Sequence, residues 1–298
     1  MSRTLVACVV GGALAVGSPR AGTNRVTEVE SRQQAAASIG KSSSLAEIGG
    51  FLWSILETEV ARSMYERTRG SGLPANPYTV GDAAWVDVDR DGVPDLVATL
   101  STSPRLIFNQ LVLVRRVSGE IKVDRVGVAD LEKLGGVLRD LDGDGKLEFV
   151  VPSEYSAGSG QNRVKWTSVL ELAPDGFIDA SEHFPQVYLG EIARTRDEIT
   201  TLALRAGQVP TPLLEEQLAG REMVLDRLLA VTGQDIDAPT RRAEGWVSSR
   251  NPALRGFAVD VFATFPDPRA SAGLRLLSKD SDAVVRGRAE VALSAPSR

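Results

Sequence analysis

The sequence is poor in the residues that most often carry redox, zinc or nucleophilic chemistry. Among its 298 residues there is one cysteine, Cys8, and one histidine, His183. A zinc site needs several nitrogen or sulfur ligands, which a single histidine does not supply. No G-x-S-x-G nucleophile elbow occurs in the sequence. We therefore expect His183 to be a structural or surface residue rather than part of a Ser/His/Asp site.

Positive charge and long apolar runs are also scarce. The formal net charge is −5, and no cluster of lysine and arginine forms a basic stripe. Nothing therefore predicts binding to nucleic acid or to an anionic membrane surface. The apolar run from Leu5 to Val16 is too short to cross a bilayer, so no integral membrane span is expected.

Residues 1–22 have the pattern of a secretory signal peptide. Arg3 precedes the apolar run, and small residues suited to cleavage follow it at 17–22. The segment ending in Cys8 also resembles a bacterial lipobox, but a lipobox cysteine follows the apolar stretch whereas Cys8 lies inside it; a lipid anchor stays the alternative. Cleavage would remove Cys8 and leave no disulfide. We expect a secreted, periplasmic or cell-envelope bacterial protein.

Two loops share the acidic pattern D-x-D-x-D-G-x-x-[D/E]. The first contains Asp87, Asp89, Asp91 and Asp95, and the second, 53 residues later (140 − 87), contains Asp140, Asp142, Asp144 and Glu148. A glycine at position 6 permits a sharp turn, so the carboxylates at positions 1, 3 and 5 converge and position 9 adds another. Carboxylates about 4 Å apart repel by about 4 kcal/mol per pair at an intermediate dielectric. The pattern therefore predicts a bound cation, and hard oxygen donors favour Ca²⁺.

The residues around the loops predict strands rather than helices. Position 12, where helix-loop-helix calcium sites carry a bidentate glutamate, is Ala98 in one loop and Val151 in the other. Apolar and largely β-branched residues flank the loops at 84–86, 96–100, 137–138 and 149–151. We therefore expect each loop to be a calcium-binding turn that connects two strands. The alternative is an ordinary Asp/Gly-rich surface turn.

This arrangement resembles the FG-GAP/VCBS repeat, the calcium-loop hairpin of integrin-like β-propellers and of many secreted bacterial proteins. The resemblance implies metal ligands from the side chains of both loops and from one backbone carbonyl in each, at Val93 and Lys146. The implied sets are Asp87, Asp89, Asp91, Val93 and Asp95, and Asp140, Asp142, Asp144, Lys146 and Glu148. Glu148 departs from the aspartate of the first loop. Because a closed propeller needs at least four blades, two units predict a partial stack that helices cap or another chain completes.

Composition divides the rest of the N-terminal half. Residues 23–43, rich in Ser, Ala, Gln and Gly, predict a flexible linker. Residues 44–70 predict an amphipathic helix that begins at an N-cap, Ser44, with Glu47 in capping-box position. The FG-GAP/VCBS-like calcium-binding β-region is expected at 78–188. Its further predicted strands are at 106–108, 111–114, 121–123, 166–172 and 177–178.

Residues 189–295 predict a helical region. Helices are expected at 192–206 and 213–231. Within 245–295 the segment Pro252 to Ala258 aligns with Ala283 to Ala289 at a shift of 31 residues (283 − 252). This resembles HEAT-type helical repeats, although the period is shorter than the usual forty or so. The resemblance implies a surface that binds a protein partner. The alternative is that these helices only cap the rest of the fold.

Together these patterns predict an α+β fold, with antiparallel β-hairpin units of partial-propeller type and calcium loops, followed by an α-helical HEAT-like region. The predicted function is that of an exported, non-catalytic calcium-binding protein in which Ca²⁺ stabilises the β-turns of a binding or adhesion-type module. The alternative is a secreted hydrolase, or an accessory subunit of an enzyme, with purely structural calcium.

Overall fold

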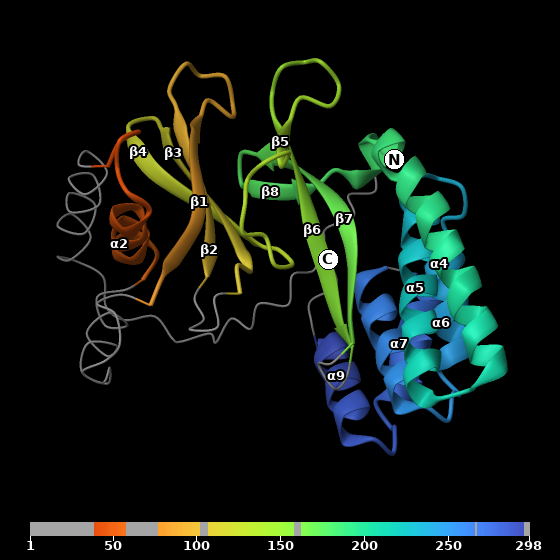
Figure 1. The fold of residues 1–298 in the computed structure, drawn as a ribbon. Helices are drawn as coiled ribbons and strands as arrows, with labels where there is room; N and C mark the ends of the chain where they lie inside the picture. The colour runs from red at the N-terminus through yellow and green to blue at the C-terminus, as the bar shows by residue number, and fades with distance from the viewer. Residues whose placement is uncertain (1–38, 58–76, 102–106, 158–161, 266, 295–298) are drawn as a thin grey trace. The chain divides into compact units, whose positions relative to one another are not determined.

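The computed structural model describes residues 39–57, 77–101, 107–157, 162–265 and 267–294. In these residues the protein is α+β, with seven α-helices and two four-stranded antiparallel sheets (Figure 1). The chain divides into two compact units, and the division passes through strands β6 and β7. Of the described residues, one unit holds those up to 152 together with 170–178, and the other holds the rest.

The first sheet is a meander whose strands are neighbours in the order of the sequence. It consists of β1 (Thr79–Val86), β2 (Asp95–Ser101), β3 (Gln110–Val117) and β4 (Glu120–Gly127). The strand predicted at 106–108 is wrong at its two described residues, which lie outside β3. The ring of Phe108 instead packs at Gly81, where a Cβ would lie 2.8 Å from it, and the Phe108 carbonyl accepts the Leu131 N–H. Tertiary packing of Phe108 thus holds residues 107 and 108 in a loop.

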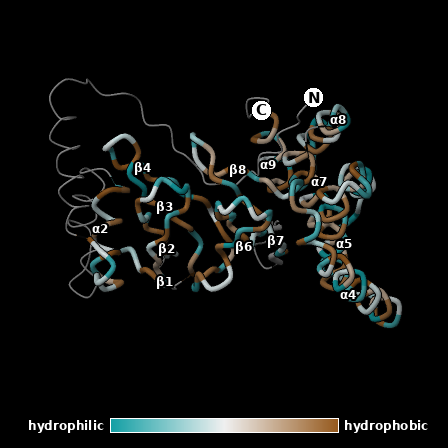
Figure 2. The backbone as a smooth tube through the Cα atoms, turned by 90° about the horizontal axis from the view of Figure 1, so that it is seen from above, coloured by the Kyte–Doolittle hydropathy of each residue, from teal (hydrophilic) through white to brown (hydrophobic). Residues whose placement is uncertain are grey.

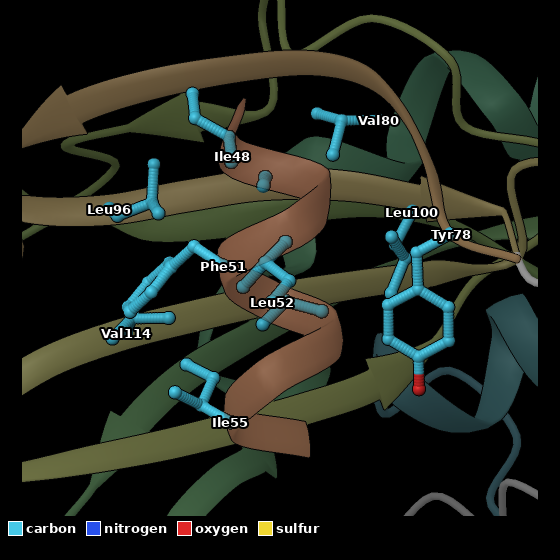
Figure 3. Packing of buried hydrophobic residues seen from close by; sticks show 11 residues of the cluster. Ile48, Phe51, Leu52, Ile55, Tyr78, Val80, Leu96, Leu100 and Val114 are labelled. Carbon is cyan, nitrogen blue, oxygen red and sulfur yellow. The ribbon is translucent and has the colours of Figure 1, made fainter. Parts of the chain in front are cut away.

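Helix α2 (Leu45–Leu56) covers one face of the first sheet (Figure 3). Its capping box is formed as predicted, because Ser44 Oγ accepts the Glu47 N–H and Glu47 Oε2 accepts the Ser44 N–H. The buried helix residues recur at intervals of three and four, which brings them onto one side. They pack against alternate residues of the strands; the cluster is Ile48, Phe51, Leu52, Ile55, Tyr78, Val80, Leu96, Ala98, Leu100, Val112 and Val114.

The intervening residues of the same strands form a second core. The second sheet contains β5 (Leu138–Arg139), β6 (Glu148–Ala157), β7 (Asn162–Ala173) and β8 (Gly176–Asp179), neighbours in that order. Successive strand residues point to opposite faces. Val97, Leu111 and Leu113 therefore pack away from α2, in a cluster with Phe149 and residues of β7 and of the segment before β5.

The remaining described residues form helices. Two short 3₁₀ helices, η1 (Ser181–His183) and η2 (Pro185–Tyr188), lie at the end of the predicted β-region, after its last predicted strand. The α-helices are α4 (Leu189–Gln208), α5 (Pro212–Val231), α6 (Ala238–Trp246), α7 (Pro252–Thr264), α8 (Pro268–Leu277) and α9 (Ala283–Ser294). Figure 2 shows hydrophilic and hydrophobic residues interspersed along α4 and α5. No helix in the described ranges is both long and apolar enough to cross a membrane.

Some of the predicted N-terminal segments lie wholly or partly outside the described residues. The predicted signal peptide at 1–22 and most of the linker at 23–43 lie outside the described residues. The helix predicted at 44–70 is wrong in its length, because α2 ends at Leu56 and Glu57 is extended, with φ −107° and ψ 145°; residues 58–70 lie outside the described residues. The last residues of the predicted linker are described and form a turn, in which the Ser43 N–H donates to the Gly40 carbonyl at 2.9 Å.

Candidate metal centre

Both acidic loops connect antiparallel strands at the same register. In the first hairpin, Val86 lies opposite Asp95 across β1 and β2. In the second, Arg139 lies opposite Glu148 across β5 and β6. Position 9 of each loop is therefore the first residue of the returning strand, opposite the residue that precedes position 1. The strands hold the two ends of each loop together, so the carboxylates at positions 1 and 9 begin close to each other.

The two loops share three internal hydrogen bonds, whereas the position 1 carboxylate accepts the Gly92 N–H of position 6 in the first loop and the Gly143 N–H of position 4 in the second. The position 9 carboxylate accepts the N–H of position 2 in each, from Val88 to Asp95 at 3.1 Å and from Leu141 to Glu148 at 2.7 Å. The carboxylate at position 3 accepts the N–H of position 5, and that at position 5 accepts the N–H of position 7. These distances are 3.3 and 2.7 Å in the first loop and 3.0 and 2.7 Å in the second. Glu148 thus makes the same contact as Asp95 despite its longer side chain.

Positive φ angles occur at equivalent positions. Position 6 is Gly92 at 84° and Gly145 at 78°, as the pattern predicts. Position 4 is also left-handed, with Gly143 at 79° and Arg90 at 63°. A non-glycine residue in this conformation is uncommon. The two backbones therefore follow the same path even where their residue types differ.

Three carboxylates converge in each loop. One oxygen each of Asp87, Asp89 and Asp95 lie within 4.8 Å of one another, and the same holds for Asp140, Asp142 and Glu148. Two oxygens bound to one Ca²⁺ at about 2.4 Å are at most about 4.8 Å apart, so each pair of oxygens in the triads lies within the largest separation that one such ion allows. The position 5 carboxylates, Asp91 and Asp144, are not members of these triads. Their coordination, and that of the Val93 and Lys146 carbonyls, stays a prediction.

The electrostatics of the first triad favour a cation. Asp95 is only 3% exposed. Burial, reinforced by the charges of Asp89, Asp91 and Asp87, raises the pKa of Asp95 to about 6, against the lowering effect of the Val88 N–H. One oxygen of Asp87, Oδ1, is buried and has no hydrogen-bond partner, while its Oδ2 accepts the Gly92 N–H. A buried carboxylate oxygen without a donor is costly unless an ion satisfies it.

The second triad also contains a carboxyl group with a raised pKa, but the increase is smaller than in the first. Burial raises the pKa of Glu148, and the charges of Asp142 and Asp144 add to the increase. The pKa of Asp144 itself is lowered, first by the Lys146 N–H and then by the Lys146 ammonium and the Arg90 guanidinium. Asp140 and Asp142 are exposed, so water screens their repulsion better than that within the first triad.

Two arginines that sequence reasoning missed lie beside the triads. Arg90 of the first loop reaches the second, where its Nη1 donates to the Asp144 carbonyl at 2.6 Å. Its guanidinium occupies the space where Gly145 would carry a Cβ, 0.9 Å from that position. Arg115 is buried, pairs with Asp124 at 3.0 Å and lies 3.8 Å from Asp89 Oδ2. Spacing within one loop carries no signal for these contacts, because they join segments far apart in sequence.

The single histidine and the depression on α4 and α5 lie apart from the two acidic loops in the sequence. His183 lies exposed on η1. An open depression on α4 and α5 is lined by Arg194, Asp197, Glu198, Thr201, Leu202 and Arg221. There Arg221 pairs with Glu198 at 3.0 Å, and the Thr201 hydroxyl donates to the Asp197 carbonyl.

Comparison with known proteins gives no match: no family model, no curated protein and no solved structure is similar to this chain.

Proposed function

We propose that this chain is an exported, non-catalytic calcium-binding protein. Ca²⁺ would bind in the loops 87–95 and 140–148 and stabilise two β-hairpins of FG-GAP/VCBS-like, partial-propeller type. The HEAT-like helical region would present a surface to a protein partner, as in a binding or adhesion module. The observation that carries the calcium proposal is that two loops of different sequence each bring three carboxylates together and share three equivalent hydrogen bonds.

The buried Asp87 oxygen supports the same proposal independently. An ordinary Asp/Gly turn uses its side-chain oxygens to accept backbone N–H groups. Asp87 Oδ2 does so, whereas Oδ1 is removed from water without any donor. Ca²⁺ takes six to eight oxygen ligands, and carboxylates bind it through one oxygen or both. A calcium ion would therefore satisfy Oδ1 and offset both the burial and the neighbouring negative charges that keep the pKa of Asp95 high.

The first test is a calcium titration by calorimetry on the protein, with thermal unfolding in calcium and in chelator. We expect two sites with dissociation constants of about 10⁻⁴ to 10⁻³ M, the range of extracellular modules. At ten times the dissociation constant, each site would stabilise the folded protein by about 1.4 kcal/mol. The melting temperature should then rise by roughly 3–6 °C per site.

A double variant, Asp89→Asn with Asp142→Asn, separates metal binding from turn formation. Asparagine keeps the side-chain oxygen that accepts the N–H of position 5, but it removes one negative charge from each triad. In calcium the variant should melt below the unaltered protein because it binds the ion more weakly. In chelator it should melt at the same temperature or above, because the repulsion is reduced.

The matched control is Asp197→Asn with Glu132→Gln, which removes two exposed carboxylates outside the loops. It should leave the calcium titration unchanged. If the unaltered protein binds no calcium, and its melts in calcium and in chelator coincide, the loops are surface turns and the proposal is wrong.

A further inference from the structure

One side chain connects the two acidic loops directly. Arg90 occupies position 4 of the loop 87–95, and its Nη1 donates to the Asp144 carbonyl of the loop 140–148 at 2.6 Å. Both loops belong to the same compact unit. The Arg90 guanidinium also fills the space beside Gly145, where a Cβ would lie 0.9 Å from Nη2. The backbone of the second loop at positions 5 and 6 therefore rests against a side chain of the first.

The contact between the loops runs in one direction. Position 4 of the second loop is Gly143, which has no side chain, and nothing lies within 4 Å of the place where its Cβ would be. Both position 4 residues are left-handed, a conformation that is unfavourable for arginine. The direction of the Arg90 side chain therefore depends on how firmly the rest of the loop 87–95 holds its backbone.

The residues on either side of Arg90 belong to the proposed calcium site. Asp89 is a member of the first triad, and Asp91 is an expected ligand from the spacing. Asp89 Oδ1 accepts the Asp91 N–H at 3.3 Å, so this hydrogen bond spans Arg90. A calcium ion bound to the first triad would fix Asp89 and thereby the left-handed backbone next to it. Occupancy of the first loop would thus hold the Arg90 guanidinium against the second.

A second connection between the loops runs through the core. Val88, at position 2 of the first loop, packs in one cluster with Val137 and with Phe149, which follows the second loop. Val88 and Phe149 are 1% and 0% exposed. These contacts join the bases of the loops and are enclosed by other core residues. Arg90, in contrast, joins the exposed parts of the loops that an ion would order, so it offers the more direct route.

We propose that Arg90 couples the two calcium loops, so that Ca²⁺ in the loop 87–95 strengthens the binding of Ca²⁺ in the loop 140–148. The first ion holds Arg90, and Arg90 holds the backbone at Asp144 and Gly145. The second loop then loses less conformational freedom when it binds its own ion, which is a source of positive cooperativity. The inference rests on the proposed calcium function and adds cooperativity to it. Arg90 is a positioning residue, because its hydrogen bond goes to a backbone carbonyl and not to a carboxylate of the triad.

The charge of Arg90 does not produce this coupling. The guanidinium is positive whether or not the first loop holds an ion, so its repulsion of a cation in the second loop is the same in both states. Repulsion between the two ions opposes the coupling. Asp140 and Asp142 are exposed, so water and salt screen that repulsion. We expect the ordering effect to exceed it and to change the affinity by roughly 3–10-fold.

The test follows each loop separately in the full chain, by NMR signals of the Gly92 and Gly145 amides during a Ca²⁺ titration. Asp87→Asn with Asp89→Asn removes two charges from the first triad and keeps side-chain oxygens that accept N–H groups. With the first loop weakened in this way, the second loop should bind Ca²⁺ roughly 3–10-fold more weakly. Unchanged or tighter binding in the second loop would overturn the proposal.

The role of Arg90 is tested by Arg90→Asn in both backgrounds. Asparagine tolerates the left-handed conformation, but its side chain is too short to replace the arginine at the Asp144 carbonyl. In this variant, weakening the first loop should change the affinity of the second by less than twofold. Arg116→Gln, which removes an exposed guanidinium from β3, is the control and should keep the full coupling. Coupling that persists in Arg90→Asn would assign it to the core and contradict the role of Arg90.

A reverse experiment removes ion binding from the second loop. In Asp140→Asn with Asp142→Asn, Ca²⁺ in the first loop should still raise the NMR order parameters of the Asp144 and Gly145 amides. Adding Arg90→Asn should abolish this rise. An ion that fills the first loop without ordering these amides would refute the mechanism, even if the two affinities were coupled.

The same titration separates the coupling from the calcium function on which it rests. If neither the Gly92 nor the Gly145 signal responds to Ca²⁺, the calcium proposal is wrong and the coupling fails with it. If both respond, and each loop fills with the same affinity whatever the state of the other, the calcium proposal stands and only the coupling is wrong.

Discussion

At the scale of single residues, two glycines of the second loop form a matched pair. Gly143 and Gly145 have φ angles of 79° and 78°, so alanine at either position carries a similar left-handed strain of about 1–2 kcal/mol. Their surroundings differ. A Cβ at Gly143 would meet nothing within 4 Å, whereas one at Gly145 would displace the Arg90 guanidinium.

We predict that Gly145→Ala destabilises the protein more than Gly143→Ala. The additional loss is that of the hydrogen bond from Arg90 to the Asp144 carbonyl, about 0.5–1.5 kcal/mol. Urea unfolding in chelator measures both variants without the contribution of calcium. The difference should disappear when Arg90→Ala is introduced into each. A difference that persists without Arg90 would show that the contact between the loops is not its cause.

The sequence predicts those contacts of the site that form between residues close together in the chain. One turn and one strand pair bring together the carboxylates at positions 1, 3 and 9. The spacing of residues within the loop is therefore enough to predict that they meet. The position 5 carboxylates, Asp91 and Asp144, are not members of the triads, although the same spacing predicts them as ligands. The Arg90 contact spans 54 residues and requires two hairpins to meet. Spacing within one loop contains no information about that meeting.

At the scale of elements, an ion pair between α7 and α9 gives a pH dependence. Burial raises the pKa of Asp260 to about 6, although Arg288 beside it lowers the value. An unfolded aspartate titrates near 3.9. The folded state therefore keeps its proton to higher pH than the unfolded state, and stability falls as pH rises from about 4 to about 6. Above that range the contribution is constant, after a loss of up to about 3 kcal/mol.

The measurement is hydrogen exchange of the α7 amides at several pH values, compared at each pH with Asp260→Asn. The asparagine variant does not titrate, so the unaltered protein should lose protection relative to it between pH 4 and 6. Glu290→Gln, which removes an exposed carboxylate from α9, serves as the control and should give a constant ratio. A constant ratio for Asp260→Asn would contradict the shifted pKa.

The sequence predicts a helix well where apolar residues recur at helical spacing over a long segment. The helices expected at 192–206 and 213–231 lie within α4 and α5, and Thr211 caps the latter as its sequence suggests. Helix α6 was not predicted, because its nine residues, APTRRAEGW, have no apolar repeat. It is held by neighbours instead: Arg242 pairs with Glu222 of α5 at 3.0 Å and with Asp226 of the same helix. Such helices depend on tertiary contacts rather than on local pattern.

At the scale of the whole molecule, the proposed calcium loops belong to one compact unit. Loops 87–95 and 140–148 lie in the unit that contains the first sheet and α2, whereas α4 to α9 belong to the other. Each unit has buried apolar residues of its own, such as Leu52 in the first and Phe257 in the second. Calcium should therefore stabilise the two units unequally.

We predict that chelation accelerates amide exchange in β2 and in the first half of β6, which begin at Asp95 and Glu148, and leaves α5 and α7 unchanged. A ligand stabilises only the structure whose unfolding destroys its site. The variant Asp89→Asn with Asp142→Asn should show in calcium the exchange pattern of the unaltered protein in chelator. Strands β6 and β7 run through both units, so they offer the route by which a change could spread. If α7 loses protection as much as β2, the two units unfold together, and calcium then controls the stability of the helical region as well as that of the hairpins.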